Sequence, residues 1–129
     1  MPKASAKILV IEDSPTQAAV IADIVRQAGH EPVVYSELTM GISQILAKEV
    51  PRIVLLDLKL LDREGNPAAD GFQLCGEIKR SALKPTVIVI SAEGDDEACE
   101  WAILQGADGY LQKPFVAKDL LAAIASALA

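Results

Sequence analysis

The stretch KILVIEDSP, residues 7–15, decides the fold because it joins a buried strand directly to a helix start. Its first five residues form a short apolar, β-branched run, which is typical of a strand buried on both faces. Ser14 can cap a helix with its side chain, Pro15 suits the first helical position, and Gly29 can close that helix. The stretch therefore predicts a strand followed at once by a helix.

The order of strand and helix then repeats along the chain. Further apolar runs of the same kind occur at residues 32–35, 53–56 and 86–90, and residues 109–112 are predicted to form a brief fifth strand. Segments with helical spacing lie between or after these runs, at about 15–28, 38–46, 72–80, 95–105 and from 117 onward. In the first of these helices, Val20, Ile24 and Ala28 form the predicted apolar stripe. Gly106 is expected to end the fourth helix as Gly29 ends the first.

Strands that alternate with helices predict an α/β fold with a parallel sheet, because parallel neighbours need a crossover connection. Right-handed crossovers place helices on both faces of an open, doubly wound sheet. We expect a single domain that covers residues 1–129. In such sheets the ligand site lies at the carboxyl ends of the strands, where the winding reverses. Functional side chains are therefore expected at that edge.

The composition fits one aliphatic-rich domain. The chain has 129 residues, 51% of them hydrophobic, and a formal net charge of −6, which disfavours direct binding to nucleic acid. Cys75 and Cys99 both fall in helical segments, so a reducing compartment is expected rather than a disulfide framework. The start of the chain is too polar for a signal peptide, and no apolar run approaches the roughly 18 residues of a membrane span. We therefore expect a cytoplasmic protein without a membrane partner.

Polar side chains follow four of the predicted strands at the edge where parallel strands end together. Glu12 and Asp13 follow the first strand, Asp57 the third, Ser91 the fourth and Lys113 the fifth. A single acid after a strand usually caps a helix, but this convergence favours a site instead. Crowded carboxylates repel one another, and a hard divalent cation with oxygen ligands relieves that repulsion. The pattern therefore predicts a Mg²⁺ site.

Several of these residues belong to short motifs that occur together: Glu12-Asp13, Asp57, Ser91-Ala92, Tyr110 and Lys113-Pro114-Phe115. Together they resemble the receiver domain of two-component response regulators, the CheY-like family, over nearly the whole chain. The resemblance implies a flavodoxin-like, five-stranded parallel sheet with strand order 2-1-3-4-5. It also implies a phosphorelay signalling switch rather than an enzyme. A sensor histidine kinase or phosphotransfer protein would supply the phosphoryl group, and a downstream protein or output domain would respond.

The resemblance implies a phosphorylation site and its metal ligands. Asp57 matches the family's phosphoacceptor, and a carboxylate can act as such a nucleophile. Asp13 and Asp57 would ligate Mg²⁺ together with the backbone carbonyl of Lys59, while Glu12 would act mainly through water. The bound metal would neutralise charge during in-line phosphoryl transfer.

The resemblance also implies how phosphorylation reaches the surface. Lys113 would pair with one phosphoryl oxygen, and the hydroxyl of Ser91 would donate a hydrogen bond to another. Pro114 matches a cis-proline that would aim Lys113 into the crevice. If Ser91 moves, the ring of Tyr110 can turn inward, as the family's aromatic switch does. The surface of the fourth helix, fifth strand and fifth helix would then change and contact a partner, or form a homodimer.

The chain departs from the family pattern after Asp57. Leu61 stands where receivers often have proline, and Asp70-Gly71 arrives about six residues late, so residues 61–69 are interpreted as an inserted surface loop. The insertion could shield the acyl phosphate, select a kinase or have no function. We also expect Lys59 and Glu93 to pair across the entrance and to restrict the hydrolytic water.

Three other functions share parts of this pattern. A degenerate receiver would bind partners without phosphorylation, and failure to label with acetyl phosphate would favour it. A flavodoxin-like cofactor carrier needs a glycine- and hydroxyl-rich phosphate loop after the first strand, where Glu12-Asp13 would repel a flavin phosphate. An aspartyl-phosphate phosphohydrolase should carry a second aspartate two residues after its nucleophile, and the chain has Lys59 there.

Overall fold

Strands and helices alternate along the chain in the computed structural model, which describes residues 5–36, 41–57, 59–61, 67–91 and 96–128. The strands are β1 (Lys7–Ile11), β2 (Glu31–Tyr35), β3 (Ile53–Asp57), β4 (Lys59–Leu61), β5 (Pro67–Asp70), β6 (Thr86–Ser91) and β7 (Gly109–Gln112). The helices are α1 (Pro15–Gln27), α2 (Ile42–Glu49), α3 (Gly71–Arg80), α4 (Asp96–Leu104) and α5 (Ala117–Leu128). None of the helices in these ranges has the length and hydrophobicity that a membrane crossing requires.

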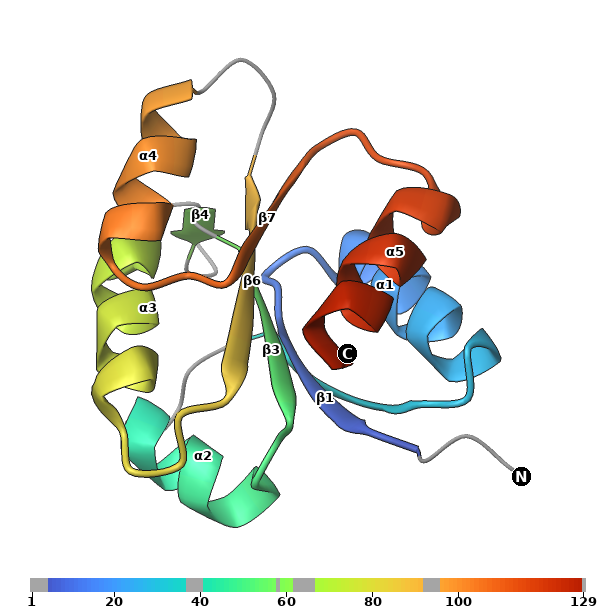
Figure 1. Cartoon of the computed structure of the whole chain (residues 1–129), viewed down its shortest axis with the longest axis horizontal. Coiled ribbons are helices and arrows are strands. Elements are labelled where there is room, and N and C mark those ends of the chain that lie inside the picture. The colour runs from blue at the N-terminus through green and yellow to red at the C-terminus, as the bar shows by residue number, and fades with distance from the viewer. Residues whose placement is uncertain (1–4, 37–40, 58, 62–66, 92–95, 129) are drawn as a thin grey trace.

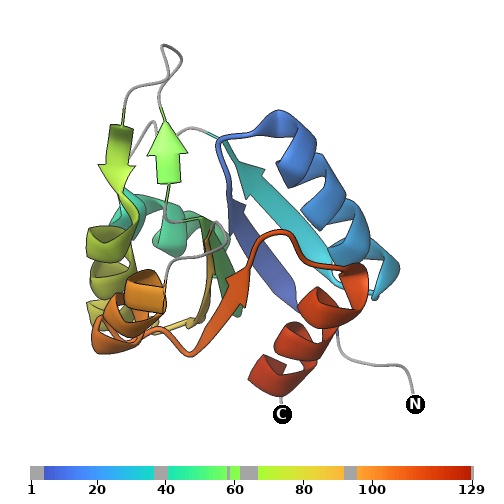
Figure 2. The same ribbon diagram turned by 90° about the horizontal axis from the view of Figure 1, so that it is seen from above.

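Five of the strands form one parallel sheet in the order β2-β1-β3-β6-β7. Helices α1 and α5 lie on one face of this sheet, and α2, α3 and α4 lie on the other (Figures 1 and 2). Numbered within this sheet alone, the order is 2-1-3-4-5. The predicted α/β class, doubly wound topology and flavodoxin-like strand order are therefore confirmed.

The central strands divide their side chains between two hydrophobic cores, because successive residues of a strand point to opposite faces. In β1, Leu9 and Ile11 join the core beneath α2, α3 and α4, whereas Ile8 and Val10 join the core beneath α1 and α5. Strands β3 and β6 alternate in the same way. Both faces are buried, so these strands occur in the sequence as unbroken apolar runs.

Helix α1 begins and ends at the residues that its capping signals predict. The side chain of Ser14 accepts a hydrogen bond from the backbone N–H of Gln17 at 3.4 Å, and Pro15 is the first helical residue. Gly29 follows the helix with φ +92°, a conformation that L side chains rarely adopt. These signals therefore set where α1 begins and ends.

The buried face of α1 differs from the predicted apolar stripe. Val20 is 54% exposed, and Ile24 and Ala28 are only partly buried. The residues that face the sheet are Ala18, Ile21, Ala22 and Val25. The small side chains of Ala18 and Ala22 let the helix approach the sheet closely, and hydrophobicity alone does not favour them over Val20 and Ile24. The predicted stripe was therefore wrong, although the helix itself was predicted correctly.

The inserted segment also differs from the predicted loop. Strands β4 and β5 pair antiparallel in a separate two-stranded sheet, with Lys59 opposite Asp70. The pair stands beyond the carboxyl end of the main sheet (Figure 2). Backbone pairing of this kind is not revealed by the glycine, asparagine and proline that suggest a loop. The loop prediction is wrong for Leu61 and for 67–69, while residues 62–66 lie outside the described part of the chain.

Candidate functional site

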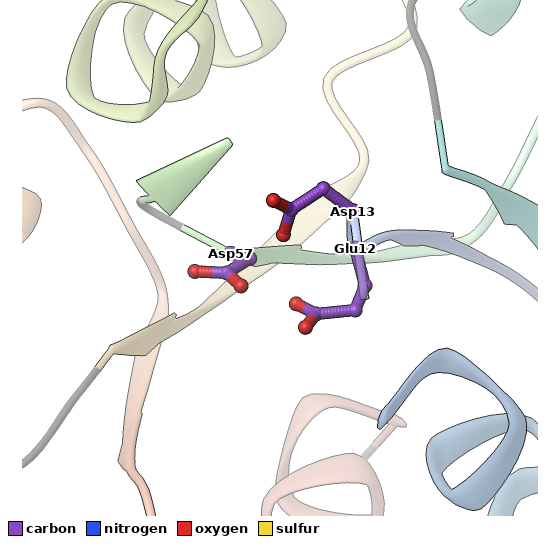
Figure 3. Close-up of side chains that lie close together, drawn as sticks. All are labelled: Glu12, Asp13 and Asp57. Carbon is purple, nitrogen blue, oxygen red and sulfur yellow. The ribbon is translucent and has the colours of Figure 1, made fainter. Parts of the chain in front are cut away.

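Strands β1 and β3 end side by side and bring three carboxylates together. Ile11 of β1 pairs with Leu56 of β3, so that Glu12 and Asp13 follow one strand where Asp57 ends the other. One oxygen from each carboxylate lies within 4.8 Å of the other two. The three side chains gather at one edge of the sheet (Figure 3). Two of them are nearly inaccessible to solvent, since Glu12 is 2% exposed and Asp57 is 5% exposed.

Lys113 brings a positive charge to these acids. Its Nζ donates hydrogen bonds to Asp57 Oδ2 at 3.0 Å and to the two Glu12 oxygens at 3.3 and 3.4 Å. It also donates to Gln17 Oε1 at 2.5 Å. The lysine predicted after the fifth strand of the main sheet therefore reaches the predicted phosphoacceptor directly.

Ser91 and Tyr110 lie on the two neighbouring strands. Ser91 ends β6 and is buried, and its backbone carbonyl accepts a hydrogen bond from the Lys113 N–H at 2.7 Å. The Lys113-Pro114 peptide bond is cis, as the resemblance implies. Tyr110 lies opposite Val89 and packs against the core beneath α3 and α4. Its hydroxyl is buried and has no hydrogen-bond partner among the described residues. The aromatic ring predicted to turn inward therefore already lies against the core.

The cluster contains three acidic side chains and one lysine, and its effect on protonation is seen in the pKa of Glu12. Burial raises the pKa of Glu12 to about 8, and the hydrogen bond with Asp57 and the charge of Asp57 act in the same direction, while Lys113 opposes them. Without a cation, Glu12 therefore holds a proton at neutral pH. A divalent cation with a preference for oxygen would displace that proton. The donor set of Glu12, Asp13 and Asp57 fits Mg²⁺.

Parts of the predicted entrance lie outside the described residues. Lys59 is the first residue of β4, and its backbone is described but its side chain is not. Ala92 and Glu93 are not described at all. The pairing of Lys59 with Glu93 therefore stays a prediction, as does the metal ligand expected from the Lys59 carbonyl.

Gln17 belongs to this edge although the strand-end pattern does not predict it. It lies in the first turn of α1 and is exposed. A glutamine on an exposed helical turn is usually only solvated, so its distance to Lys113 is what reveals it. One signal was available, because α1 begins two residues after Asp13 and its first turn must lie near the strand ends.

Comparison of the sequence with known proteins identifies a family and several relatives. The family model of the response regulator receiver domain matches residues 8–125. The chain is 32% identical over 120 residues to transcriptional regulatory protein YxdJ of Bacillus subtilis, with 93% of the chain covered. It is 30% identical over 120 residues to the phosphate regulon transcriptional regulatory protein PhoB of Escherichia coli, with 92% covered. The chain spans about half (49%) of the length of these curated relatives.

Solved structures give the same result. A response regulator receiver domain protein from Clostridium thermocellum is 32% identical, with a TM-score of 0.82 and coverage of 95% of this chain and 94% of that one. NtrX from Brucella abortus, in complex with ATP, is 32% identical with a TM-score of 0.83, and the match covers 97% of this chain and 27% of NtrX.

Receiver domains generally bind Mg²⁺, and the cluster of Glu12, Asp13 and Asp57 has the oxygen donors for it. Response regulators are signalling proteins rather than classical enzymes, and they interact with histidine kinases and with output domains. The chain belongs to the response regulator receiver domain family of two-component systems.

Proposed function

We propose that the chain is a phosphorelay switch in which Asp57 accepts a phosphoryl group. The observation that carries the proposal is the contact of a nearly buried Asp57 with Lys113, beside two further acids. An oxygen of the Asp57 carboxylate would attack the phosphorus atom and form a new O–P bond. The bond between phosphorus and the donor's histidine nitrogen would break, and the imidazole would leave with the electron pair. The donor would be a sensor histidine kinase or a phosphotransfer protein.

Asp13 and Asp57 would hold Mg²⁺ with the backbone carbonyl of Lys59, and Glu12 would act through water. When bound, the ion supplies positive charge next to the oxygens of the transferred group. Support for this assignment comes from the three clustered carboxylates, because burial, and after it the hydrogen bond with Asp57 and the charge of Asp57, raise the pKa of Glu12.

Lys113 and Ser91 would hold the product of the transfer. The ammonium group of Lys113 already contacts Asp57, so a small movement would bring it to a phosphoryl oxygen. The hydroxyl of Ser91, at the end of the neighbouring strand, would donate to another phosphoryl oxygen. Tyr110 lies on β7, next to the strand that Ser91 ends, and its ring would move when Ser91 moves, as the aromatic switch.

We assign the partner surface to α4, β7 and α5. Three apolar residues of α4 are largely exposed: Trp101 is 54%, Ile103 is 61% and Leu104 is 74% exposed. Such a set favours contact with another protein. Its occupant would be a downstream protein, an output domain or a second copy of the chain.

The proposal is tested by the intact mass of the protein after incubation with acetyl phosphate and MgCl₂. We expect the wild type to gain the mass of one phosphoryl group and Asp57→Asn to gain none. Asp23→Asn is the matched control, because Asp23 is an exposed carboxylate on α1 whose partner is Gln27. Asp23→Asn should label as the wild type does.

Two results would count against the proposal. Labelling of Asp57→Asn would show that another residue is the acceptor. An unlabelled wild type that still binds its partner would instead indicate a degenerate receiver, which acts without phosphorylation.

A further inference from the structure

The acceptors around the Lys113 ammonium group are of two kinds. Four acceptor atoms from three side chains lie within 3.4 Å of Nζ. Those of Glu12 and Asp57 are carboxylate oxygens of the acidic cluster, whereas that of Gln17 is the oxygen of a neutral amide. An ammonium group has three protons to donate, so each of these side chains can receive one.

Phosphorylation would change two of these three contacts. A cation at the cluster would compete with Lys113 for the oxygens of Glu12 and Asp57, and an acyl phosphate would take up one Asp57 oxygen. The amide of Gln17 carries no net charge, so its oxygen is a weaker ligand for a divalent cation than the neighbouring carboxylates are. The contact between Gln17 and Lys113 is therefore the one that can persist through the reaction.

The backbone of Gln17 is well placed to hold such a contact. Its N–H donates to the side chain of Ser14 at 3.4 Å, and the N–H of Ala18 donates to the Ser14 carbonyl at 2.8 Å. Both bonds belong to the first turn of α1, so the backbone of Gln17 is held within a capped helical turn. Gln17 and Lys113 also line one groove of about 510 Å³ between α1 and the start of α5, so the two side chains face the same space.

We propose that Gln17 is a positioning residue that holds the Lys113 ammonium group at the phosphoacceptor while the carboxylates change partners. The inference rests on the proposed function of Asp57. Without the amide oxygen, the hydrogen bonds that Lys113 Nζ keeps within the described part of the chain are those to Glu12 and Asp57, which metal and phosphoryl group would disturb. Lys113 then spends less time in the position where it can contact the incoming phosphoryl oxygens, and transfer slows.

The test compares the initial rate of phosphorylation by acetyl phosphate and MgCl₂ in two glutamine variants. Gln17→Met keeps the length of the side chain and removes the acceptor. Gln27→Met makes the same change at the other end of α1, where the amide contacts Asp23. Loss of an exposed hydrogen bond to a charged group predicts a rate about three- to tenfold lower for Gln17→Met. Gln27→Met should phosphorylate at the wild-type rate.

A double-mutant cycle distinguishes positioning from a general structural effect. If Gln17 acts through Lys113, Gln17→Met should have no further effect on the rate in a Lys113→Met background. An equal slowing in both backgrounds would overturn the proposal. So would a wild-type rate for Gln17→Met, and in that case the function of Asp57 would stand. A wild type that never labels would instead refute the proposed function itself.

The lysine ammonium signals give a second measurement that needs no phosphorylation. In protein labelled with ¹⁵N at lysine and measured with MgCl₂, a held Lys113 ammonium should exchange slowly with water, and Gln17→Met should speed that exchange. Lys79 is the internal reference, since its Nζ donates to Asp108 Oδ2 at 2.7 Å and to the Pro85 carbonyl at 3.1 Å. Unchanged exchange at Lys113 would contradict the proposal.

Discussion

The two tyrosines of the chain differ in the hydrogen bonding of their hydroxyl groups. The Tyr35 hydroxyl donates to Glu49 Oε2 at 2.7 Å, and Glu49 Oε1 also pairs with Lys7 Nζ at 3.0 Å. The Tyr110 hydroxyl is buried with no hydrogen-bond partner among the described residues. A buried hydroxyl without a partner loses its bonds to water and gains none in return. The same substitution should therefore act in opposite directions at the two positions.

We expect Tyr110→Phe to raise the free energy of unfolding by about 1 kcal/mol, because it removes an unsatisfied group. Tyr35→Phe should lower it, because it leaves Glu49 with one partner fewer. Urea denaturation of both variants measures the two changes. If Tyr110→Phe destabilised the chain as much as Tyr35→Phe does, the hydroxyl of Tyr110 would have a partner in solution.

Glu12 links stability to pH at the residue scale. Its pKa is about 8 in the folded chain against an ordinary value of 4.5. Between these values the folded state binds one proton more than the unfolded state, so the contribution of Glu12 to stability falls as pH rises from 4.5 to about 8. We expect metal-free wild type to lose stability across this window, and Glu12→Gln to lose less. Urea midpoints at several pH values in EDTA measure the difference.

Magnesium should oppose this loss, because an ion that binds only the folded state stabilises it. At the upper end of the window fewer protons compete for Glu12, so MgCl₂ should raise the thermal midpoint more near pH 8 than near pH 6. Asp13→Asn removes a predicted ligand and should reduce the shift. An equal shift of the thermal midpoint at both pH values would show that Mg²⁺ binding does not depend on the protonation of Glu12.

At the scale of elements, the helix ends show how backbone conformation selects residues. Gly29 and Gly106 follow α1 and α4 at φ +92° and +98°, and the next residue in each case donates its N–H back into the helix. Helix α2 differs in the residue at its end, because Val50 rather than glycine takes the left-handed conformation, at φ +46°. A β-branched residue is strained there, whereas glycine or asparagine is not.

We expect Val50→Asn to raise the free energy of unfolding by about 1 kcal/mol, because it relieves this strain. Val50 is 59% exposed, so little packing is lost. Gly29→Ala is the reciprocal variant, since an added Cβ would meet nothing within 4 Å and only the backbone conformation is penalised. It should lower stability by about the same amount. A destabilised Val50→Asn would show that the valine side chain contributes contacts in solution.

At the scale of the whole molecule, both hydrophobic cores share one sheet. Ile45 of α2 belongs to one core and Ile124 of α5 to the other, and both are almost fully buried. Strand residues alternate between the two cores, so neither core can open without exposing the back of the same strands. We therefore propose that residues 1–129 form a single cooperative domain.

Cooperative unfolding can be measured with one substitution in each core. Ile45→Ala and Ile124→Ala should each lower the free energy of unfolding by about 2–5 kcal/mol. In each variant, far-UV circular dichroism and Trp101 fluorescence should report one coincident transition in urea. Two separate transitions in either variant would mean that the cores fold independently.

Much of this molecule follows from local patterns in the chain. The apolar run at residues 7–11 predicts a strand with two buried faces, and Gly29 and Gly106 predict helix ends that the structure confirms. Alternation of strands and helices then leads to the parallel sheet. Because all its strands end at one edge, Glu12, Asp13 and Asp57 could be expected to meet before any distance was known.

The remaining features depend on distances between segments far apart in the sequence. Gln17 and Lys113 are 96 positions apart, and only the tertiary structure brings α1 close to the segment between β7 and α5. The face that α1 buries and the pairing of β4 with β5 likewise follow from tertiary contacts and backbone hydrogen bonds. The periodicity of apolar residues indicates which residues prefer burial, and capping residues indicate where helices end. Neither pattern contains the distances between side chains across the fold. The acidic cluster could therefore be predicted from the sequence, whereas the raised pKa of Glu12 and the amide beside Lys113 were decided by the tertiary structure.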